Sequence, residues 1–414
     1  MKSIFLFLLI LPSYNLFAQY EAPFYLKFTE EAERAKTYER IVQNVIYKNL
    51  EGPLNDSTED SYEAAFNAME VANYSSTATW QKVQEAMNVL PFQSLSFQRS
   101  VLEVAYTVYP SDFMKEVTAL MRTTADPRIF GMCAVYLLKA DPEAYTMIED
   151  VLVKNFPDSL RNHPILMGLQ QFSGNAVRDA EKEKVLNVLL SKDFLPGETV
   201  LFSFQRKNRD YPGMVMVRKR DGSFVKEQNE YFHAPQLARG IANLPFFLTK
   251  GNTPQGLYRM FGFGVSRNQS IGPTANIQMG MPVELSREKF FDNRKMKGEW
   301  SIEDYRQLLP ESVRDYKPLY ETYIAGSAGR NEIIAHGTTI DPSYYIGKPY
   351  YPMTPTEGCL CTKEFWDGKL IYSDQQRLIN AMLSAGGAYG YVVVIELNDE
   401  QQPVVIDDVL QYLN

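Results

Sequence analysis

The 414-residue sequence predicts a two-part protein, with an all-α, solenoid-like domain over residues 19–195 and a mainly-β domain over residues 196–414. Apolar residues recur at spacings of three and four in Glu30 to Ile46, Tyr62 to Ala72 and Trp80 to Val89, which is typical of amphipathic helices. Beyond about residue 195, short β-rich runs alternate with glycine and proline. The change between these patterns puts the domain boundary near residues 190–197.

Recurring start signals predict how the helices are arranged. Ser111, Asp126, Asp141 and Asp158 are each predicted to open a helix, at separations of 15, 15 and 17 residues. The middle two precede proline, so the carboxylate caps the helix and the proline fills its first position. Starts about one helix length apart predict stacked antiparallel helices of the solenoid type, although no strict repeat signature is present.

The C-terminal half contains strand, hairpin and helix signals. The turn sequence Arg220-Asp221-Gly222-Ser223 between two β-rich runs predicts a hairpin. One helix is predicted to open at Ser373, with Gln376 completing a capping box, and to close at Gly386-Gly387. The clearest predicted strands are Val200 to Phe204, Met214 to Val217, Phe246 to Leu248 and Tyr391 to Leu397.

The N-terminus predicts export. Met1-Lys2, the apolar run Ile4 to Leu11 and a small residue at Ala18 have the parts of a cleavable signal peptide spanning residues 1–18. No apolar run reaches the roughly 20 residues of a transmembrane helix. Removing Lys2 with the signal changes the net charge from −8 to −9. The acidic balance argues against nucleic acid as a partner. We expect a protein of the periplasm or cell envelope.

The small number of cysteines and histidines argues against a disulfide framework and against a metal site. Three cysteines in a chain of this size are not a disulfide framework, and three scattered histidines without a Cys-x-x-Cys motif predict no metal site. Cys133 lies on a helical apolar stripe and is expected to be a core residue. His163 and His233 are expected to be structural. The glycines of Gly262-Phe263-Gly264 are a weak phosphate-loop signal, because no helix follows them.

Cys359 and His336 have the residue types of a thiol nucleophile and its base. They are 23 positions apart, which allows two neighbouring strands to bring imidazole and sulfur together. Gly358 permits a sharp turn, so that the N–H groups of Gly358 and Cys359 are expected to face a developing oxyanion. Thr362 is expected to cap a short helical turn whose positive end favours the thiolate.

Three segments in this order resemble the L,D-transpeptidase catalytic domain, a family of peptidoglycan-remodelling cysteine enzymes. Asn252-Thr253-Pro254-Gln255-Gly256-Leu257-Tyr258-Arg259 resembles the family's Thr-Pro-x-Gly-x-[Phe/Tyr] strand. His336-Gly337-Thr338 and Thr356-Glu357-Gly358-Cys359-Leu360 resemble its histidine-glycine pair and its Ser/Thr-x-Gly-Cys-aliphatic segment. The resemblance covers residues 197 to 410 and says nothing about the helical half.

The resemblance implies a β-sandwich-like domain in which the cysteine is acylated by a peptidoglycan stem peptide and passes the acyl group to an amine. Cys359 would be the nucleophile and His336 the general base, with the Gly337 carbonyl orienting the imidazole. The backbone at Gly358 would line the oxyanion hole. We expect Arg259, Thr338, Tyr351 and Thr356 to contact substrate. The family implies no metal or organic cofactor.

Departures from the family pattern keep other functions open. Glu357 and Cys361 stand where the family has histidine and arginine, and the insertion Asp341 to Pro355 is either a lid or a packed loop. A hydrolase that uses water as acceptor, acting as an L,D-carboxypeptidase or amidase, is one alternative. A non-catalytic wall-binding or assembly factor is another, with a protein partner on the helical half. For the enzyme, activity is expected to rise as His336 loses its proton and to fall at high pH.

Overall fold

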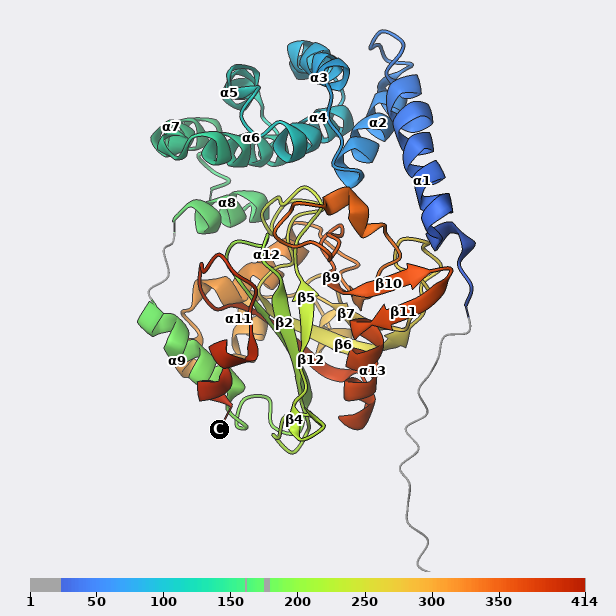
Figure 1. Cartoon of the computed structure of the whole chain (residues 1–414). Coiled ribbons are helices and arrows are strands. Elements are labelled where there is room, and N and C mark those ends of the chain that lie inside the picture. The colour runs from blue at the N-terminus through green and yellow to red at the C-terminus, as the bar shows by residue number, and fades with distance from the viewer. Residues whose placement is uncertain (1–23, 161, 175–178, 414) are drawn as a thin grey trace, which may run out of the picture.

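The computed structural model describes residues 24–160, 162–174 and 179–413, and the predicted signal peptide lies outside them. Figure 1 shows a layer of helices stacked on one end of a β-rich body. The coarse division into a helical N-terminal half and a sheet-rich C-terminal half is therefore confirmed.

The N-terminal helices lie in two rows. Helices α2, α4, α6 and α8 pack in sequence as one row, and α3, α5 and α7 form a second row that contacts it. The bounds are α1 Glu31–Arg40, extended by a π-helical stretch Ile41–Tyr47, α2 Glu59–Val71, α3 Thr77–Val89, α4 Leu95–Val108, α5 Met114–Thr123, α6 Pro127–Ala140, α7 Tyr145–Asn155, α8 Pro164–Gly174 and α9 Asp179–Leu190.

Two of the four predicted helix starts are correct. The Asp126 carboxylate accepts from two N–H groups of the first turn of α6, and Asp141 caps a 3₁₀ turn that leads into α7. The start at Ser111 was wrong, since α5 begins at Met114 without a side-chain cap. The start at Asp158 was also wrong. It lies in a turn, and the helix begins at Pro164, a residue suited to a first helical position.

The sheet forms a closed barrel of eight strands, so the expected β-sandwich was wrong. The order around the barrel is β1-β12-β6-β7-β8-β9-β5-β2, with β2 pairing back to β1. The strands are β1 Thr199–Gln205, β2 Gly213–Arg218, β5 Ala234–Leu237, β6 Gly256–Gly264, β7 Asn276–Gly280, β8 Ala335–His336, β9 Leu360–Thr362 and β12 Tyr389–Glu396. Two-stranded ribbons, β3 Lys226–Glu227 with β4 Glu230–Tyr231 and β10 Glu364–Asp367 with β11 Lys369–Ser373, lie outside it.

Further helices pack against the barrel. The outer face of β1, β2, β6 and β12 packs against α9 and the segments around α10 Arg287–Phe290, α11 Ile302–Arg306 and the C-terminus. Helix α12 Glu321–Ser327 packs on β6 and α8. Helix α13 Asp374–Ser384 is capped by the Ser373 hydroxyl, which accepts from the Gln376 N–H at 2.8 Å, and ends before Gly386 and Gly387 as predicted. The predicted capping box is not completed, because the Gln376 side chain donates to Asn380 instead.

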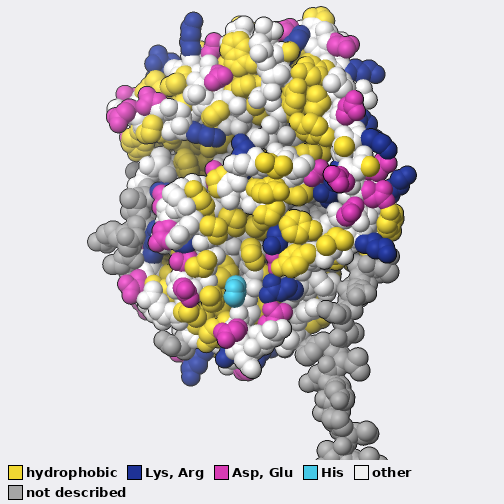
Figure 2. All heavy atoms as spheres, viewed as in Figure 1, with side chains coloured by type: hydrophobic (Ala, Val, Ile, Leu, Met, Phe, Trp, Pro, Cys, Tyr) yellow, Lys and Arg dark blue, Asp and Glu magenta, His cyan; other side chains and the backbone are white. Residues whose placement is uncertain are grey.

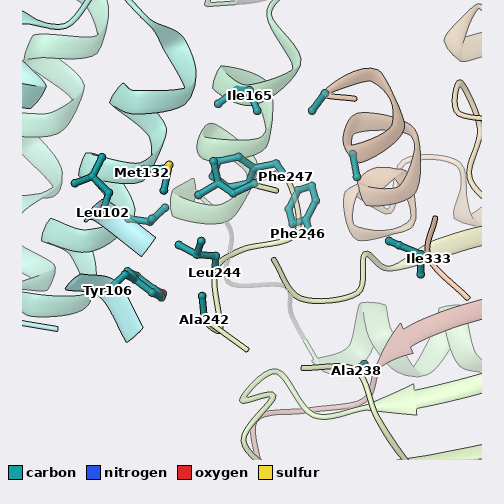
Figure 3. Close-up of a cluster of buried hydrophobic side chains, with 14 of the residues drawn as sticks. Leu102, Tyr106, Met132, Ile165, Ala238, Ala242, Leu244, Phe246, Phe247 and Ile333 are labelled. Atoms are coloured by element: carbon teal, nitrogen blue, oxygen red, sulfur yellow. The ribbon is translucent and has the colours of Figure 1, made fainter. Parts of the chain in front are cut away.

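One hydrophobic cluster joins the two halves. It draws on every strand of the barrel and continues into α2, α4, α6 and α8. Figure 3 shows the joint, where Phe247 lies beside α8 and close to Gly131 of α6, and Phe246 packs on Phe247. Phe246 to Leu248 was predicted as a strand, but it forms a turn whose side chains enter the helical half. A tertiary contact therefore determines the conformation of this apolar run.

Gly168 on α8 provides a test of this joint. A Cβ at Gly168 would lie 2.4 Å from the Cβ of Phe247, whereas Gly174 on the same helix has nothing within 4 Å. We expect Gly168→Ala to lower the free energy of unfolding by about 1–3 kcal/mol through overpacking. Gly174→Ala is the matched control and should be neutral or slightly stabilising. Urea unfolding checks both, and equal midpoints for the two variants would contradict the contact.

The surface shows no segregation of charge in the view of Figure 2, where basic, acidic and hydrophobic side chains are interspersed over both halves. No helix in the described part of the chain has the length and apolarity to span a bilayer.

Candidate active site

Strands β8 and β9 place His336 and Cys359 on the same outer face of the barrel wall. The strands are parallel, with Ala335 opposite Leu360 and His336 opposite Cys361. Ala335 and Leu360 face the barrel interior, so the alternating residues His336 and Cys361 face outward. Cys359 precedes β9 and lies opposite Ile334, whose N–H points at the sulfur at 3.5 Å. Thiol and imidazole are therefore diagonal neighbours on one face.

The Cys359 thiol is partly exposed and neutral at rest. Its Sγ lies 3.6 Å from the carbonyl oxygen of Glu332, to which the thiol donates. Burial raises the pKa of Cys359 to about 11, against the lowering effects of the Ile334 N–H and the Arg330 guanidinium. Among the described residues, no hydrogen bond joins the sulfur to His336. A base must take the thiol proton before the sulfur can attack a carbonyl.

The imidazole of His336 is buried, and its Nδ1 is held by the neighbouring backbone. Its Nδ1 forms a short hydrogen bond with the carbonyl oxygen of Gly337, which fixes the neutral tautomer with Nε2 as acceptor. Burial lowers the pKa of His336 to about 4. If His336 acts as the base expected from the sequence, its acid limb lies near pH 4 and not near pH 6.5. Between pH 5 and 9 His336 is already neutral and available to accept a proton.

Glu364 supports this histidine and was missed by the sequence analysis. Its carboxylate accepts from the Thr338 N–H at 3.0 Å and from the Ser373 hydroxyl at 2.6 Å. A Cβ at Gly337 would meet that carboxylate at 2.1 Å, so glycine is required there. Burial raises the pKa of Glu364 to about 7. Only the folded chain brings Glu364, on β10, under the His336-Gly337-Thr338 segment.

Thr356 and Gly358 shape the loop that presents the cysteine. The Thr356 hydroxyl accepts from the Gly358 N–H at 3.1 Å and donates to the Cys359 carbonyl at 2.9 Å. Gly358 has φ +112°, a conformation that favours glycine. The Gly358 N–H is thus occupied, which corrects its predicted place in an oxyanion hole. The Cys359 N–H has no partner among the described residues and remains available.

Arg330 braces the same loop and was also missed. It is 6% exposed and donates to the carbonyl oxygens of Asn252 at 2.7 Å and Gly251 at 2.8 Å, and to that of Phe246. A Cβ at Gly358 would lie 2.2 Å from an Arg330 guanidinium nitrogen. This is a cation near Cys359 in a chain that lacks the arginine the family has after its cysteine. Lone arginines carry no sequence signal for such a role.

The segment that resembles the family's Thr-Pro strand reaches the cysteine loop. The Thr253 hydroxyl donates to the Gly358 carbonyl at 2.9 Å, and β6 begins at Gly256. Three segments that are distant in sequence, at Thr253, His336 and Cys359, therefore meet at one place.

The other residues predicted to contact substrate have different surroundings. Thr338 is buried, and its hydroxyl bonds Thr354 and the Ser270 carbonyl. Tyr351 is 46% exposed. Arg259 lies 3.7 Å from Glu198 and 3.6 Å from Asp292, and its guanidinium stacks on Tyr391. These partners of Arg259 belong to none of the segments that build the cysteine loop.

The insertion Asp341 to Pro355 is a packed loop. Tyr345, Tyr350 and Met353 are buried in a small cluster with Leu237. The Tyr345 hydroxyl donates to the carbonyl of Val71 on α2, and Asp341 pairs with Arg34 on α1 at 3.3 Å. Contacts with the helical half therefore fix this loop beside the site.

Two other cysteines and one other histidine have structural surroundings. Cys133 is buried in the helical core, His233 bonds the carbonyl of Tyr231, and Cys361 is buried opposite His336. The expected helical turn at Thr362 was wrong, because Thr362 ends β9 and its hydroxyl bonds the Gln375 side chain at 2.6 Å. No helix dipole therefore acts on the sulfur from this side.

Glu357, next to the cysteine loop, connects it to the helical half. Lys250 lies 3.5 Å from Glu357 and 3.8 Å from Glu103 of α4. Glu70 of α2 is buried beside them without a hydrogen bond among the described residues. Burial, followed by repulsion from Glu103, raises the pKa of Glu70 well above its usual range. One lysine thus faces three carboxyl groups where the two halves meet.

This cluster predicts a pH-dependent stability. A raised folded-state pKa means that stability is lost as pH rises above about 4.5, by at most about 1.4 kcal/mol per pH unit for Glu70. Glu70→Gln removes that loss, so the variant should gain stability over the wild type as pH increases. Urea unfolding at pH 5 and pH 8 measures it, with Asp60→Asn, an exposed position on the same helix, as control. If the difference in unfolding free energy between Glu70→Gln and the wild type is the same at both pH values, the raised pKa of Glu70 is contradicted.

No protein-family model, curated protein or solved structure matches this chain.

Proposed function

We propose that the protein is an exported cysteine acyltransferase of the L,D-transpeptidase type that acts on peptidoglycan stem peptides. The observation that carries the proposal is the meeting of three family-like segments, with the Thr253 hydroxyl on the Gly358 carbonyl and Ile334, two residues before His336, at the Cys359 sulfur. The Gly337 carbonyl accepts from Nδ1 of His336, which leaves Nε2 as the nitrogen that can accept a proton.

The proposed reaction is an acyl transfer through a Cys359 thioester. His336 Nε2 takes the thiol proton as Cys359 Sγ attacks the peptide carbonyl carbon. The oxyanion accepts a hydrogen bond from the Cys359 N–H, which is worth roughly 3–4 kcal/mol for a well-placed donor. The carbon–nitrogen bond breaks, and the departing amine takes the proton from His336. An acceptor amine then attacks the thioester carbonyl, gives its proton to His336 and releases the thiol.

Incubation with muropeptide tetrapeptides tests the proposal. Mass spectrometry should find a cross-linked product with the wild type and none with Cys359→Ala. Cys133→Ala, which alters a cysteine buried in the helical core, is the control and should retain the product. No product from the wild type, or equal product from Cys359→Ala, would refute the proposal. Hydrolysis without cross-linking in the presence of an acceptor amine would assign the water-using alternative instead.

A specific observation favours one further candidate, a wall-binding factor without catalysis. Burial raises the pKa of the Cys359 thiol, and the Gly358 N–H is occupied by Thr356, both of which weaken a catalytic site. The factor would bind wall peptides equally well with Cys359→Ala and form no thioester.

A further inference from the structure

Five large apolar side chains remain exposed where the N-terminal segment meets the β-rich half. Two stretches that are distant in sequence carry them, residues 24–30 and the β10–β11 ribbon. The side chains are those of Phe24, Tyr25, Phe28, Ile371 and Tyr372, with exposed fractions from 36% at Phe28 to 67% at Ile371, and we call them the apolar patch. An aromatic side chain offers roughly 150–250 Å² of surface, so these fractions amount to several hundred Å². Apolar patches of that size are often interaction sites.

The two stretches are joined at the turn of the ribbon. The Leu26 N–H donates to the Gly368 carbonyl at 2.6 Å, and a Cβ at Gly368 would lie 2.6 Å from the Tyr25 ring. Figure 1 shows the N-terminal segment beside the turn between β10 and β11. Ile371 and Tyr372 follow Gly368 by three and four residues, which keeps them within about 13 Å of the turn. The five side chains therefore lie on one part of the surface.

The cations beside the apolar patch are lysines. Lys27 lies between the aromatic residues of the N-terminal stretch, and Lys363 and Lys369 lie on either side of β10, whereas neither stretch contains arginine. The Lys363 ammonium lies over the rings of Phe365 and Tyr372, 5.6 and 4.7 Å from their centroids. Protein–protein interfaces are depleted in lysine and enriched in arginine. Aromatic rings together with lysines are instead typical of surfaces that lie in a membrane interface.

The unpaired charges around the apolar patch are mainly positive. Lys27 and Lys369 are exposed, and neither forms an ion pair within the described residues. The third lysine pairs with the buried Asp374 at 3.9 Å. Of the nearby acids, Glu30 accepts from a tyrosine of the patch and Asp367 is exposed. In a chain whose net charge is −8, two unpaired lysines here complement the anionic headgroups of phospholipids.

The place of the apolar patch in the chain also favours a membrane as the partner. The patch begins at Phe24, 13 positions after Leu11, the last residue of the apolar run in the predicted signal peptide. Thirteen residues span at most about 45 Å. A signal peptide that is bound to the membrane therefore keeps the apolar patch close to the bilayer until cleavage.

We propose that the apolar patch binds the surface of a phospholipid membrane that contains anionic lipid. The aromatic side chains and Ile371 enter the headgroup region, and the ammonium groups of Lys27 and Lys369 reach the lipid phosphates. This inference goes beyond the proposed function and is independent of it, because neither Cys359 nor a stem peptide takes part in the binding.

Flotation with vesicles of phosphatidylethanolamine and phosphatidylglycerol tests the proposal, with the secreted chain whose N-terminus is confirmed by intact mass. We expect Phe28→Ser with Ile371→Ser to lower the partition constant about tenfold or more, because two apolar side chains no longer leave water. Phe92→Ser with Leu95→Ser is the matched control, since these residues of the helical half are 87% and 52% exposed, and it should bind as the wild type does. An unchanged urea midpoint confirms that both double variants fold.

The lysines have a separate expected result. Lys27→Gln with Lys369→Gln should weaken binding to the anionic vesicles and leave binding to phosphatidylcholine vesicles unchanged. A wild-type protein that does not float with the anionic vesicles would overturn the proposal, as would equal loss of binding in the two serine double variants. Light scattering without vesicles tests the other occupant, a second copy of the chain. A dimer that Phe28→Ser with Ile371→Ser dissociates would assign the apolar patch to self-association and reject membrane binding.

Discussion

Replacing His336 with glutamine is expected to slow acylation of Cys359 by about 10²- to 10⁴-fold, the range typical of a lost general base. The thiol cannot supply its own thiolate, since burial raises its pKa to about 11. His233→Gln is the matched control, because the His233 imidazole is exposed and its Nδ1 bonds the carbonyl of Tyr231. A stopped-flow measurement of acylation by a carbapenem gives both rates.

The same measurement has a predicted pH profile. His336, with its pKa lowered to about 4 by burial, is neutral above about pH 5. The wild-type rate should therefore be constant between pH 5 and 9 and fall only as pH approaches 4. An acylation rate that rises with a midpoint near pH 6.5 would show that the His336 imidazole is more exposed to solvent than it is here. Equal rates for His336→Gln and His233→Gln would remove the base role altogether.

Replacing Arg330 with glutamine is expected to have the second large effect. Three backbone carbonyls, of Phe246, Gly251 and Asn252, would lose their donors in a buried place. The expected cost is about 3 kcal/mol or more in the free energy of unfolding. The pKa of Cys359 should rise further, because the Arg330 guanidinium lowers it. Arg330→Lys keeps the charge without the planar fork and should be intermediate.

Two measurements separate the effect of Arg330 on stability from its effect on the pKa of the Cys359 thiol. Urea unfolding measures stability, and the rate of iodoacetamide reaction against pH measures the thiol pKa. Arg267→Gln, an exposed arginine on the β6–β7 connection, is the control and should alter neither. An Arg330→Gln protein that unfolds and reacts like the wild type would show that the contacts with the cysteine loop are immaterial.

Local signals predicted local structure well. The strands around Val200, Met214 and Tyr391, the turn at Gly222 and the capped helix at Ser373 all depend on short-range patterns, and the structure has them. Closure of the sheet was not predictable in the same way, because it depends on β2 returning to β1 and on pairing between distant strands.

The sequence motifs of the site were predictable, but the residues that hold those motifs in place were not. Neighbouring strands place Cys359 and His336 on one face, as their spacing suggested. Glu364, Arg330 and Lys250 act through burial and long-range contacts, for which a single sequence has no pattern. Thr362 was misjudged because a threonine that follows a strand carries the same residue type as a helix cap.

The most direct test of the account is the intact mass of the wild-type protein after incubation with a carbapenem, with the modified residue mapped by peptide digestion. The account predicts one adduct, located on Cys359, that is absent from Cys359→Ala. An unmodified protein, or an adduct on Cys361 or Cys133 alone, would contradict the claim that Cys359 is the nucleophile.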